Sequence, residues 1–179
     1  MIIFAIVFFA TLILDLLTKY LVMGELGHRF SLGDGFMSVF YAENRGVAFG
    51  WLYGAGSVLA GVTAGIIAIA VIFYVVHRVG LQRKGRKIPK LLDISFALFL
   101  SGSLGNLFDR LVHGYVRDFI RLDFWASFPI FNFADVFINV GVVLIVVYIL
   151  FMEGSKLGKK TKVGQLPVEP QPTNDSKPN

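Results

Sequence analysis

Four long hydrophobic stretches dominate the pattern of apolar and polar positions along this chain. A bilayer is crossed by about 20 helical residues that each rise roughly 1.5 Å. Backbone groups inside a bilayer must form hydrogen bonds within their own segment, which favours helices over open strands. The pattern therefore predicts four transmembrane helices, at approximately residues 2–23, 56–76, 91–112 and 134–152.

The first stretch also has to be considered as a cleaved signal peptide. It lacks the basic start and the small-x-small cleavage site of such a peptide, and its apolar run contains Asp15 and Lys19. We therefore interpret it as a retained span. In the second span, Gly61 and Gly65 lie four residues apart, and this spacing predicts close packing against a neighbouring helix.

The connection between the first two spans has a different pattern. Residues 24–55 interleave aromatic and apolar positions with glycines, which is typical of short strands and turns. Aromatic side chains there, and Trp125 in the last connection, suit the membrane–water interface. The expected fold is a mainly α membrane protein: a four-transmembrane-helix bundle with a small extracytoplasmic β-rich loop, or flap, at the membrane surface. The flap is expected over residues 30–51.

The basic residues indicate the topology of the bundle. Residues 77–90 and the segment after Met152 together hold 11 of the 17 basic residues. Because Lys and Arg are enriched in cytoplasmic loops, both segments and both termini are expected in the cytoplasm. The connections 24–55 and 113–133 are then external.

The end of the chain differs in composition from the rest. Residues 154–179 are rich in Lys, Pro and polar side chains, and such a segment cannot bury enough apolar surface to fold. We expect a single transmembrane domain over residues 1–153, followed by a disordered cytoplasmic tail.

Composition excludes several classes of protein. Of 179 residues, 55% are hydrophobic and 16% charged, whereas soluble domains average about a quarter charged, so a water-soluble enzyme is excluded. The net charge of +5 reflects topology and contact with membrane lipids, and no nucleic acid partner is expected. There is no Cys, and the three His are scattered. We therefore expect no metal and no cofactor.

Polar residues at membrane depth are the informative positions, because ionisable groups are costly there. Asp15 and Lys19 are spaced for an ion pair on one helix face. Asp109 is expected to pair with the adjacent Arg110. Asn132 is either a helix N-cap or part of a site. Asp118 lies in a short apolar stretch, residues 116–120, that is expected to re-enter or skirt the membrane.

Asp118 and Asp135 come from neighbouring segments on the same, outer side of the predicted topology. Neither has a basic residue four positions on. Two carboxylates held close together cannot both ionise easily, so one keeps a proton. Such a pair suits a general base that activates water and a general acid that protonates a leaving amine. A buried carboxylate pair is also found in transporters, so the pair alone does not decide the function.

Two alternatives belong to other classes of protein. A small proton-coupled transporter or accessory subunit would use Asp15, Asp109 and Asp135 as a relay. A relay needs groups spread across the bilayer, whereas these acids gather at one edge. A purely structural membrane-assembly protein leaves the costly polar cluster unexplained.

Five short blocks in this order resemble the lipoprotein signal peptidase family, also called signal peptidase II. The blocks are Asp15-Leu16-Leu17-Thr18-Lys19, Asn44-Arg45-Gly46-Val47-Ala48-Phe49, Gly105-Asn106-Leu107-Phe108-Asp109-Arg110, Val116-Arg117-Asp118-Phe119 and Phe131-Asn132-Phe133-Ala134-Asp135. The resemblance covers roughly residues 2–152. Arg117 departs from it, because an apolar residue is more often expected before the acid.

The resemblance implies an aspartic endopeptidase of the bacterial inner membrane. Its partners would be membrane lipids and prolipoproteins whose lipobox cysteine carries a diacylglyceryl group, and it would cut just before that cysteine. Asp118 and Asp135 resemble the catalytic pair. The residues that resemble the substrate-binding or supporting set are Asp15, Lys19, Asn44, Gly46, Asn106, Asp109, Arg110 and Asn132. We expect the enzyme to be a monomer.

Overall fold

The computed structural model describes residues 1–24, 30–33, 35–46 and 56–153. Along the chain the elements are α1 (Ile2–Gly24), β1 (Phe30–Leu32), β2 (Met37–Asn44), α2 (Gly56–Arg83), α3 (Lys90–His113), β3 (Val116–Leu122), α4 (Phe133–Val147) and the π-helix η2 (Tyr148–Glu153). The expected tail, residues 154–179, and part of the expected flap lie outside the described residues.

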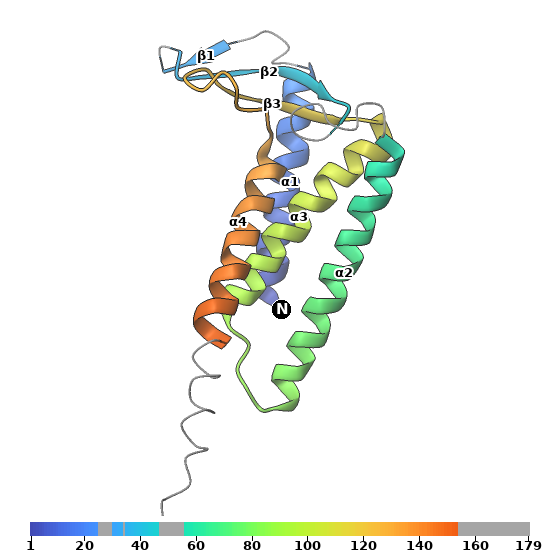
Figure 1. The fold of residues 1–179 in the computed structure, drawn as a ribbon, viewed down its shortest axis with the longest axis vertical. Coiled ribbons are helices and arrows are strands. Elements are labelled where there is room, and N and C mark those ends of the chain that lie inside the picture. Colours follow the sequence, from blue (N-terminus) through green and yellow to red (C-terminus); the bar gives the residue numbers. More distant parts are fainter. Residues whose placement is uncertain (25–29, 34, 47–55, 154–179) are drawn as a thin grey trace, which may run out of the picture.

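The four predicted spans are confirmed as helices long and apolar enough to cross a membrane. They run side by side, with the small sheet at one end of the bundle and the connection between α2 and α3 at the other (Figure 1). We call these the sheet end and the hairpin end. The ends of α1 and α3 lie within a residue of those predicted, and so do the ends of the fourth span when α4 and the π-helix η2 that continues it are taken together.

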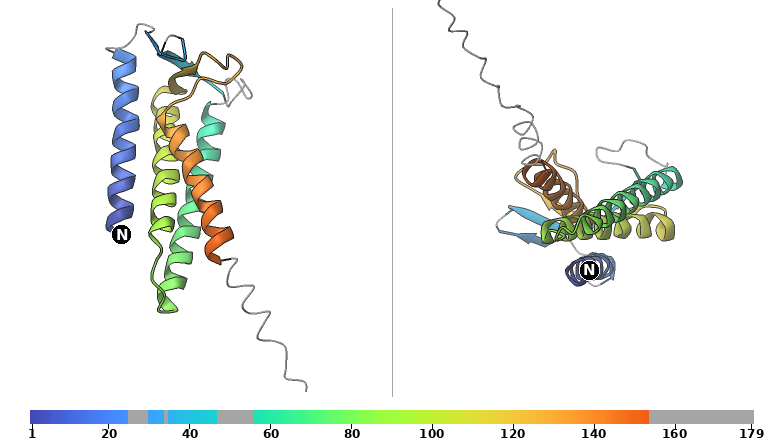
Figure 2. Two further views of the ribbon diagram at one scale, coloured as in Figure 1. Left: turned by 90° about the vertical axis from the view of Figure 1, so that its left-hand side faces the viewer. Right: turned by 90° about the horizontal axis from the view of Figure 1, so that it is seen from below.

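Helix α3 is the centre of the bundle. It packs against each of the other three helices, with α1 on one side and α2 and α4 on the other (Figure 2). About two thirds of its most apolar window is buried, against less than a fifth for the other spans. The exposed apolar side chains of α1, α2 and α4 form the lipid-facing surface, as expected for helices whose solvent is a bilayer.

Glycines allow the close approach of α3 to its neighbours. A Cβ at Gly102 would clash with the Ala134 carbonyl oxygen, and one at Gly105 would clash with the Asp15 carboxylate. The predicted close packing at Gly61 and Gly65 is wrong, because nothing lies within 4 Å of a Cβ built at either position. Gly61 instead lines a hollow between α2 and the end of α3, which its missing side chain leaves open.

The sheet is antiparallel with strand order β1-β2-β3. Gly33 and Gly35 have positive φ in the turn between β1 and β2, which confirms the predicted strands and turns. Residues 116–120 belong to this sheet and do not form a re-entrant segment within the bundle, whereas their lying along the membrane surface stays a prediction. They form β3, and their backbone pairs with β2, with Asp118 opposite Ala42.

The predicted end of the second span at residue 76 is too early, because α2 continues to Arg83. Tyr74 and Arg78 both donate hydrogen bonds from α2 to Asp93 at the start of α3. These bonds join the part of α2 that follows its apolar run to α3, and they stabilise the helix beyond residue 76. Asp93 therefore joins two helices at the hairpin end.

Candidate functional site

The predicted site residues meet at the sheet end, where α1, α3, β2, β3 and the start of α4 converge. Asn132 begins α4 as its N-cap, and its side-chain oxygen accepts from the Asp135 N–H at 3.0 Å. Asp135 Oδ2 accepts from the Asn132 N–H at 3.2 Å in return. This reciprocal capping box fixes the direction of the Asp135 side chain. The cap expected for Asn132 is confirmed.

Asn132 also connects the two acids through its side-chain amide. Its Nδ2 donates to Asp118 Oδ1 at 2.6 Å and to Asn106 Oδ1 at 3.2 Å. Asn106 Nδ2 donates in turn to Asp135 Oδ1 at 2.8 Å. Asn132 is completely buried, so these bonds are formed in a medium of low polarity, where they are strong. Two Asn side chains thus tie β3, α3 and α4 together between the carboxylates.

Asp118 is buried in β3 and accepts hydrogen bonds on both oxygens. The second bond comes from Asn44 Nδ2 of β2, at 2.9 Å, and Asn44 is itself oriented by the Gly46 N–H at 3.1 Å. The pKa of Asp118 is raised to about 7, chiefly by burial and also by the nearby charge of Asp135, against the lowering effects of the two amide bonds and of the charge of Lys19. Asp118 therefore retains a proton for much of the time at neutral pH.

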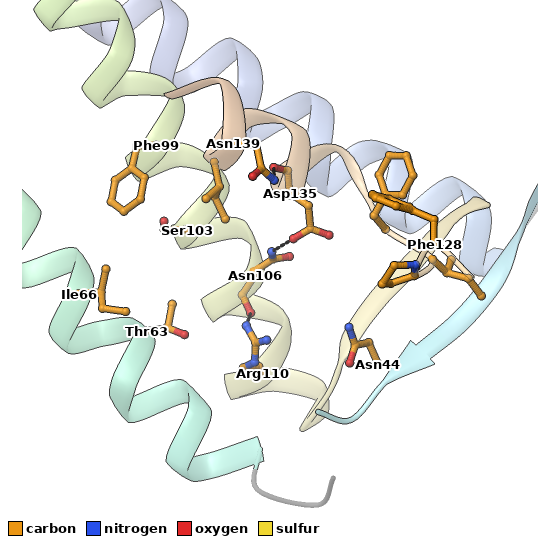
Figure 3. Close-up of a pocket in the computed structure, with 14 residues that line it drawn as sticks. Asn44, Thr63, Ile66, Phe99, Ser103, Asn106, Arg110, Phe128, Asp135 and Asn139 are labelled. Atoms are coloured by element: carbon orange, nitrogen blue, oxygen red, sulfur yellow. Dashed lines mark hydrogen bonds between the residues drawn. The ribbon is translucent and has the colours of Figure 1, made fainter. Parts of the chain in front are cut away.

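A cavity of about 420 Å³ opens beside Asp135, which lines it, whereas Asp118 lies behind its lining residue Asn44 and does not line it. Asp135, Asn106 and Arg110 lie on its polar side, and Thr63 and Ile66 of α2 lie across from them (Figure 3). Its lining residues are Asn44, Thr63, Ile66, Phe99, Ser103, Asn106, Arg110, Phe128, Pro129, Ile130, Phe131, Asp135, Ile138 and Asn139. The cavity offers apolar walls to a chain that enters it and a few hydrogen-bonding groups at one place.

A second layer of charge lies behind the amides. Lys19 Nζ donates to Asp15 Oδ2 at 2.8 Å and to Asn106 Oδ1 at 2.9 Å, and it lies 3.4 Å from Asp109 Oδ2. The side chains of Asp15, Lys19 and Asp109 are completely buried. The predicted Asp15–Lys19 ion pair is confirmed. Asp15 Oδ1 also accepts from the Ala134 N–H at 2.9 Å, which joins α1 to the first turn of α4.

The predicted pairing of Asp109 with Arg110 is wrong. Asp109 Oδ1 accepts from Arg117 Nη2 at 2.6 Å and from Arg117 Nε at 3.1 Å. Arg110 lies on the cavity and donates to the Asn106 carbonyl at 3.4 Å. Adjacent residues of a helix point in different directions, so sequence adjacency does not make an ion pair.

Sequence reasoning missed Arg117 as a member of this cluster. Its place could not be predicted, because it depends on a strand that the sequence did not indicate and on the packing of that strand against α3. Sequence reasoning also missed the cavity residues Thr63, Ser103 and Phe128, whose types are common and carry no signal of their own. Within the described part of the chain, no group of three or more His, Asp or Glu side chains is arranged to hold a metal ion.

Members of one family are similar in sequence to this chain. A family model described as signal peptidase (SPase) II matches residues 7–151. The lipoprotein signal peptidase of Fusobacterium nucleatum is 38% identical and the match covers 86% of this chain and 90% of that protein. The lipoprotein signal peptidase of Salmonella typhi is 41% identical over 75% of this chain and 80% of its own length.

Two solved structures have a similar fold. One is described as a bacterial membrane enzyme structure obtained by the in meso method at 2.3 Å resolution. It matches with a TM-score of 0.68 and 25% identity over 93% of this chain and 94% of its own. A second with the same description, at 1.9 Å resolution, has a TM-score of 0.69 and 28% identity over 83% of this chain and 92% of its own. The bundle with its small sheet is therefore also found in a bacterial membrane enzyme.

Proposed function

The chain belongs to the signal peptidase II family, and from this premise we propose that it is an aspartic endopeptidase that removes signal peptides from diacylglyceryl-modified prolipoproteins, cutting before the lipidated cysteine. One observation carries the proposal: two carboxylates, Asp118 and Asp135, are joined through buried amides beside a cavity at one end of a four-span bundle. A substrate anchored by lipid approaches from within the membrane, which suits a cavity at this depth.

In the proposed mechanism the two acids divide the proton transfers between them. Asp135, which lines the cavity, takes a proton from a water that attacks the scissile carbonyl. Asp118, whose raised pKa of about 7 leaves it protonated for much of the time, supplies a proton to the leaving amine. The amides support this division because they hold both carboxylates in place without adding a charge.

The other residues have supporting roles in this proposal. Asn44, Asn106 and Asn132 orient the acids, and the Gly46 N–H orients Asn44. Arg110 offers the cavity a cationic donor for substrate carbonyl oxygens. Asp15, Lys19 and Asp109 hold the helices in register behind the site. The proposed mechanism uses no metal and no cofactor.

Four apolar helices and the family make the chain a multi-pass bacterial membrane protein. We further propose that the sheet end faces the outside of the inner membrane, that both termini and a disordered tail are cytoplasmic, and that the enzyme works as a monomer among membrane lipids. The charge asymmetry of the sequence supports this orientation.

Cysteine labelling tests the orientation cleanly, because the native chain has no Cys. Single cysteines would replace Lys84, in the turn at the hairpin end, and Leu32, exposed on the sheet. An impermeant thiol reagent added to intact cells is expected to label position 32 and to reach position 84 only after permeabilisation. Labelling of position 84 in intact cells would reverse the proposed orientation.

The activity is tested with purified enzyme and a diacylglyceryl-modified prolipoprotein, following release of the signal peptide. The matched control is the same prolipoprotein without the lipid. Cleavage of the lipidated form alone is expected, and no cleavage of either form would contradict the proposal. The alternative of a proton-coupled transporter is not favoured by the family, and α2 contains no acidic residue that could extend a relay.

A further inference from the structure

A salt bridge behind the carboxylate pair has no part in the mechanism described so far. We infer that Arg117 is a positioning residue for Asp118 and that it acts through Asp109. The inference rests on the proposed function, because it concerns the geometry of the acid that the proposed mechanism uses. It is carried by buried contacts on both sides of the peptide that precedes Asp118.

Asp109 of α3 holds both the side chain and the backbone of Arg117. Its Oδ1 accepts from Arg117 Nη2 at 2.6 Å and from Nε at 3.1 Å. Its Oδ2 accepts from the Arg117 backbone N–H at 3.0 Å. Both residues are buried, and charge-assisted bonds of this kind are short and directional. The first residues of β3 are therefore fixed on α3 at three points.

Asn132 holds the same peptide from the other side. Its Nδ2 donates to the Arg117 carbonyl oxygen at 3.4 Å and to Asp118 Oδ1 at 2.6 Å. Because side chains alternate along a strand, Arg117 and Asp118 point to opposite faces of β3. A strand whose Arg117 side is fixed cannot rotate about its own axis, so the bond to Asp109 sets the direction in which Asp118 points.

The same contact keeps a positive charge away from Asp118. A cation close to a carboxylate favours its ionised form. Asp109 binds the guanidinium of Arg117 on the face of β3 opposite Asp118, and neutral amides from Asn44 and Asn132 occupy the oxygens of Asp118 instead. Arg117 thereby anchors the strand while Asp118 keeps the capacity to hold a proton.

A salt bridge with a structural role alone would affect the stability of the protein and leave the turnover of folded enzyme unchanged. The two roles are therefore separated by kcat, KM and the pH profile, all measured on folded protein well below its unfolding temperature. Arg117→Met removes the charge and the bonds, and Arg117→Lys keeps the charge but not the two-pronged geometry. Arg121 is the matched control, because it lies on the same strand and is half-exposed beside Asp123.

With the lipidated prolipoprotein as substrate, Arg117→Met is expected to lower kcat at least tenfold and to leave KM within twofold of wild type. Arg117→Lys is expected to recover part of that loss, and Arg121→Met to match wild type. The limb of the pH profile that reports Asp118 is expected to move to higher pH in Arg117→Met, because the hydrogen bonds from Asn44 and Asn132 favour the ionised form of Asp118 and are loosened when the strand is no longer held.

A wild-type kcat in Arg117→Met, or a loss confined to KM, would overturn the positioning role. If Arg117→Met does not accumulate as folded protein, Arg117→Gln takes its place under the same criteria. Wild-type enzyme is assayed beside every variant. A wild type that cleaves no lipidated substrate refutes the proposed function, whereas an active wild type with an unimpaired variant refutes only the role of Arg117.

Discussion

Acidic side chains are buried at both ends of the bundle, but different kinds of groups bind them at each end. At the hairpin end, Asp93 accepts from the Tyr74 hydroxyl at 2.7 Å and forms an ion pair with Arg78. At the sheet end, Asp118 and Asp135 accept from neutral side-chain amides. Two buried cations of the sheet end are bound to other acids, with Lys19 on Asp15 and Asp109, and Arg117 on Asp109. Arg110 lies on the cavity with Asp135 and donates to the Asn106 carbonyl oxygen.

The type of hydrogen-bond donor distinguishes an acid with a structural role, Asp93, from the two acids with a proposed role in proton transfer. A cation at hydrogen-bond distance stabilises the ionised carboxylate and fixes its charge. An amide donor fixes the position of a carboxylate and leaves its protonation free to change during a reaction. In the proposed mechanism, ion pairs join helices and amides hold the two acids that transfer protons.

The largest effect is expected from removing the acids themselves. Asp118→Asn and Asp135→Asn are each expected to lower the cleavage rate by at least the roughly 10²–10⁴-fold typical of general acid–base catalysis, and to remain folded. Asp93→Asn is the matched variant at the hairpin end and is expected to keep most of its activity while unfolding at a lower temperature. Cleavage assays and thermal unfolding in detergent check all three. An inactive but stable Asp93→Asn would erase the distinction between the two ends.

The next effect concerns the buried cations. Lys19→Met leaves Asp15 and Asp109 buried without their shared cation, and removing one partner of such a group destabilises a protein by about 3–5 kcal/mol. Arg78→Met is expected to destabilise less, because the Arg78 side chain is 12% exposed and that of Lys19 is 0% exposed. Denaturant unfolding in detergent measures both. An equal loss of stability in Lys19→Met and Arg78→Met would show that the burial of the cation does not decide the size of the effect.

A smaller effect is expected from the glycines. Gly105→Ala places a Cβ against the Asp15 carboxylate, and overpacking of this kind destabilises by about 1–3 kcal/mol. Gly65→Ala, in α2, has nothing within 4 Å of the added atom and is expected to be neutral or to stabilise by up to about 1 kcal/mol. The same unfolding measurement applies. A harmless Gly105→Ala would mean that α1 and α3 are not held closely at the sheet end.

A further effect is a dependence of stability on pH. The pKa of Asp118 is raised to about 7 in the folded protein, whereas an Asp in the unfolded chain titrates near pH 4. Between about pH 4 and pH 7 the folded protein therefore holds a proton that the unfolded chain has already released. Stability from this group therefore falls as pH rises through that window, by at most about 1.4 kcal/mol per pH unit. Asp118→Asn is expected to remove this component, and the difference between the two unfolding curves isolates it. Parallel curves for the two proteins would contradict a raised pKa.

Local sequence signals predicted much of this molecule. The length of the apolar runs gave the four spans, and the spacing of Asp15 and Lys19 gave their ion pair. The position of Asn132 before an apolar run gave the helix cap. Each of these features depends on residues within one turn or one element, where the periodicity of the backbone decides which side chains meet.

Contacts between distant elements could not be obtained in this way. The predicted pairing of Asp109 with Arg110 was wrong. Asp109 instead binds Arg117, which comes from a strand whose position beside α3 depends on the whole fold. Gly61 and Gly65 have the spacing of a packing motif, but nothing lies within 4 Å of a Cβ built at either position, and Gly61 lines a hollow. The strand at residues 116–122 was missed because its apolar pattern also suits a segment that enters the membrane.

Titration of the Asp118 carboxyl group by ¹³C NMR in detergent tests the central claim most directly, with the resonance assigned by its loss in Asp118→Asn. The account predicts a midpoint near pH 7, and a lower midpoint when Asp135→Asn removes the neighbouring charge. A midpoint near pH 4, unchanged by Asp135→Asn, would mean that burial and the charge of Asp135 do not raise the pKa of Asp118. That result would contradict the account.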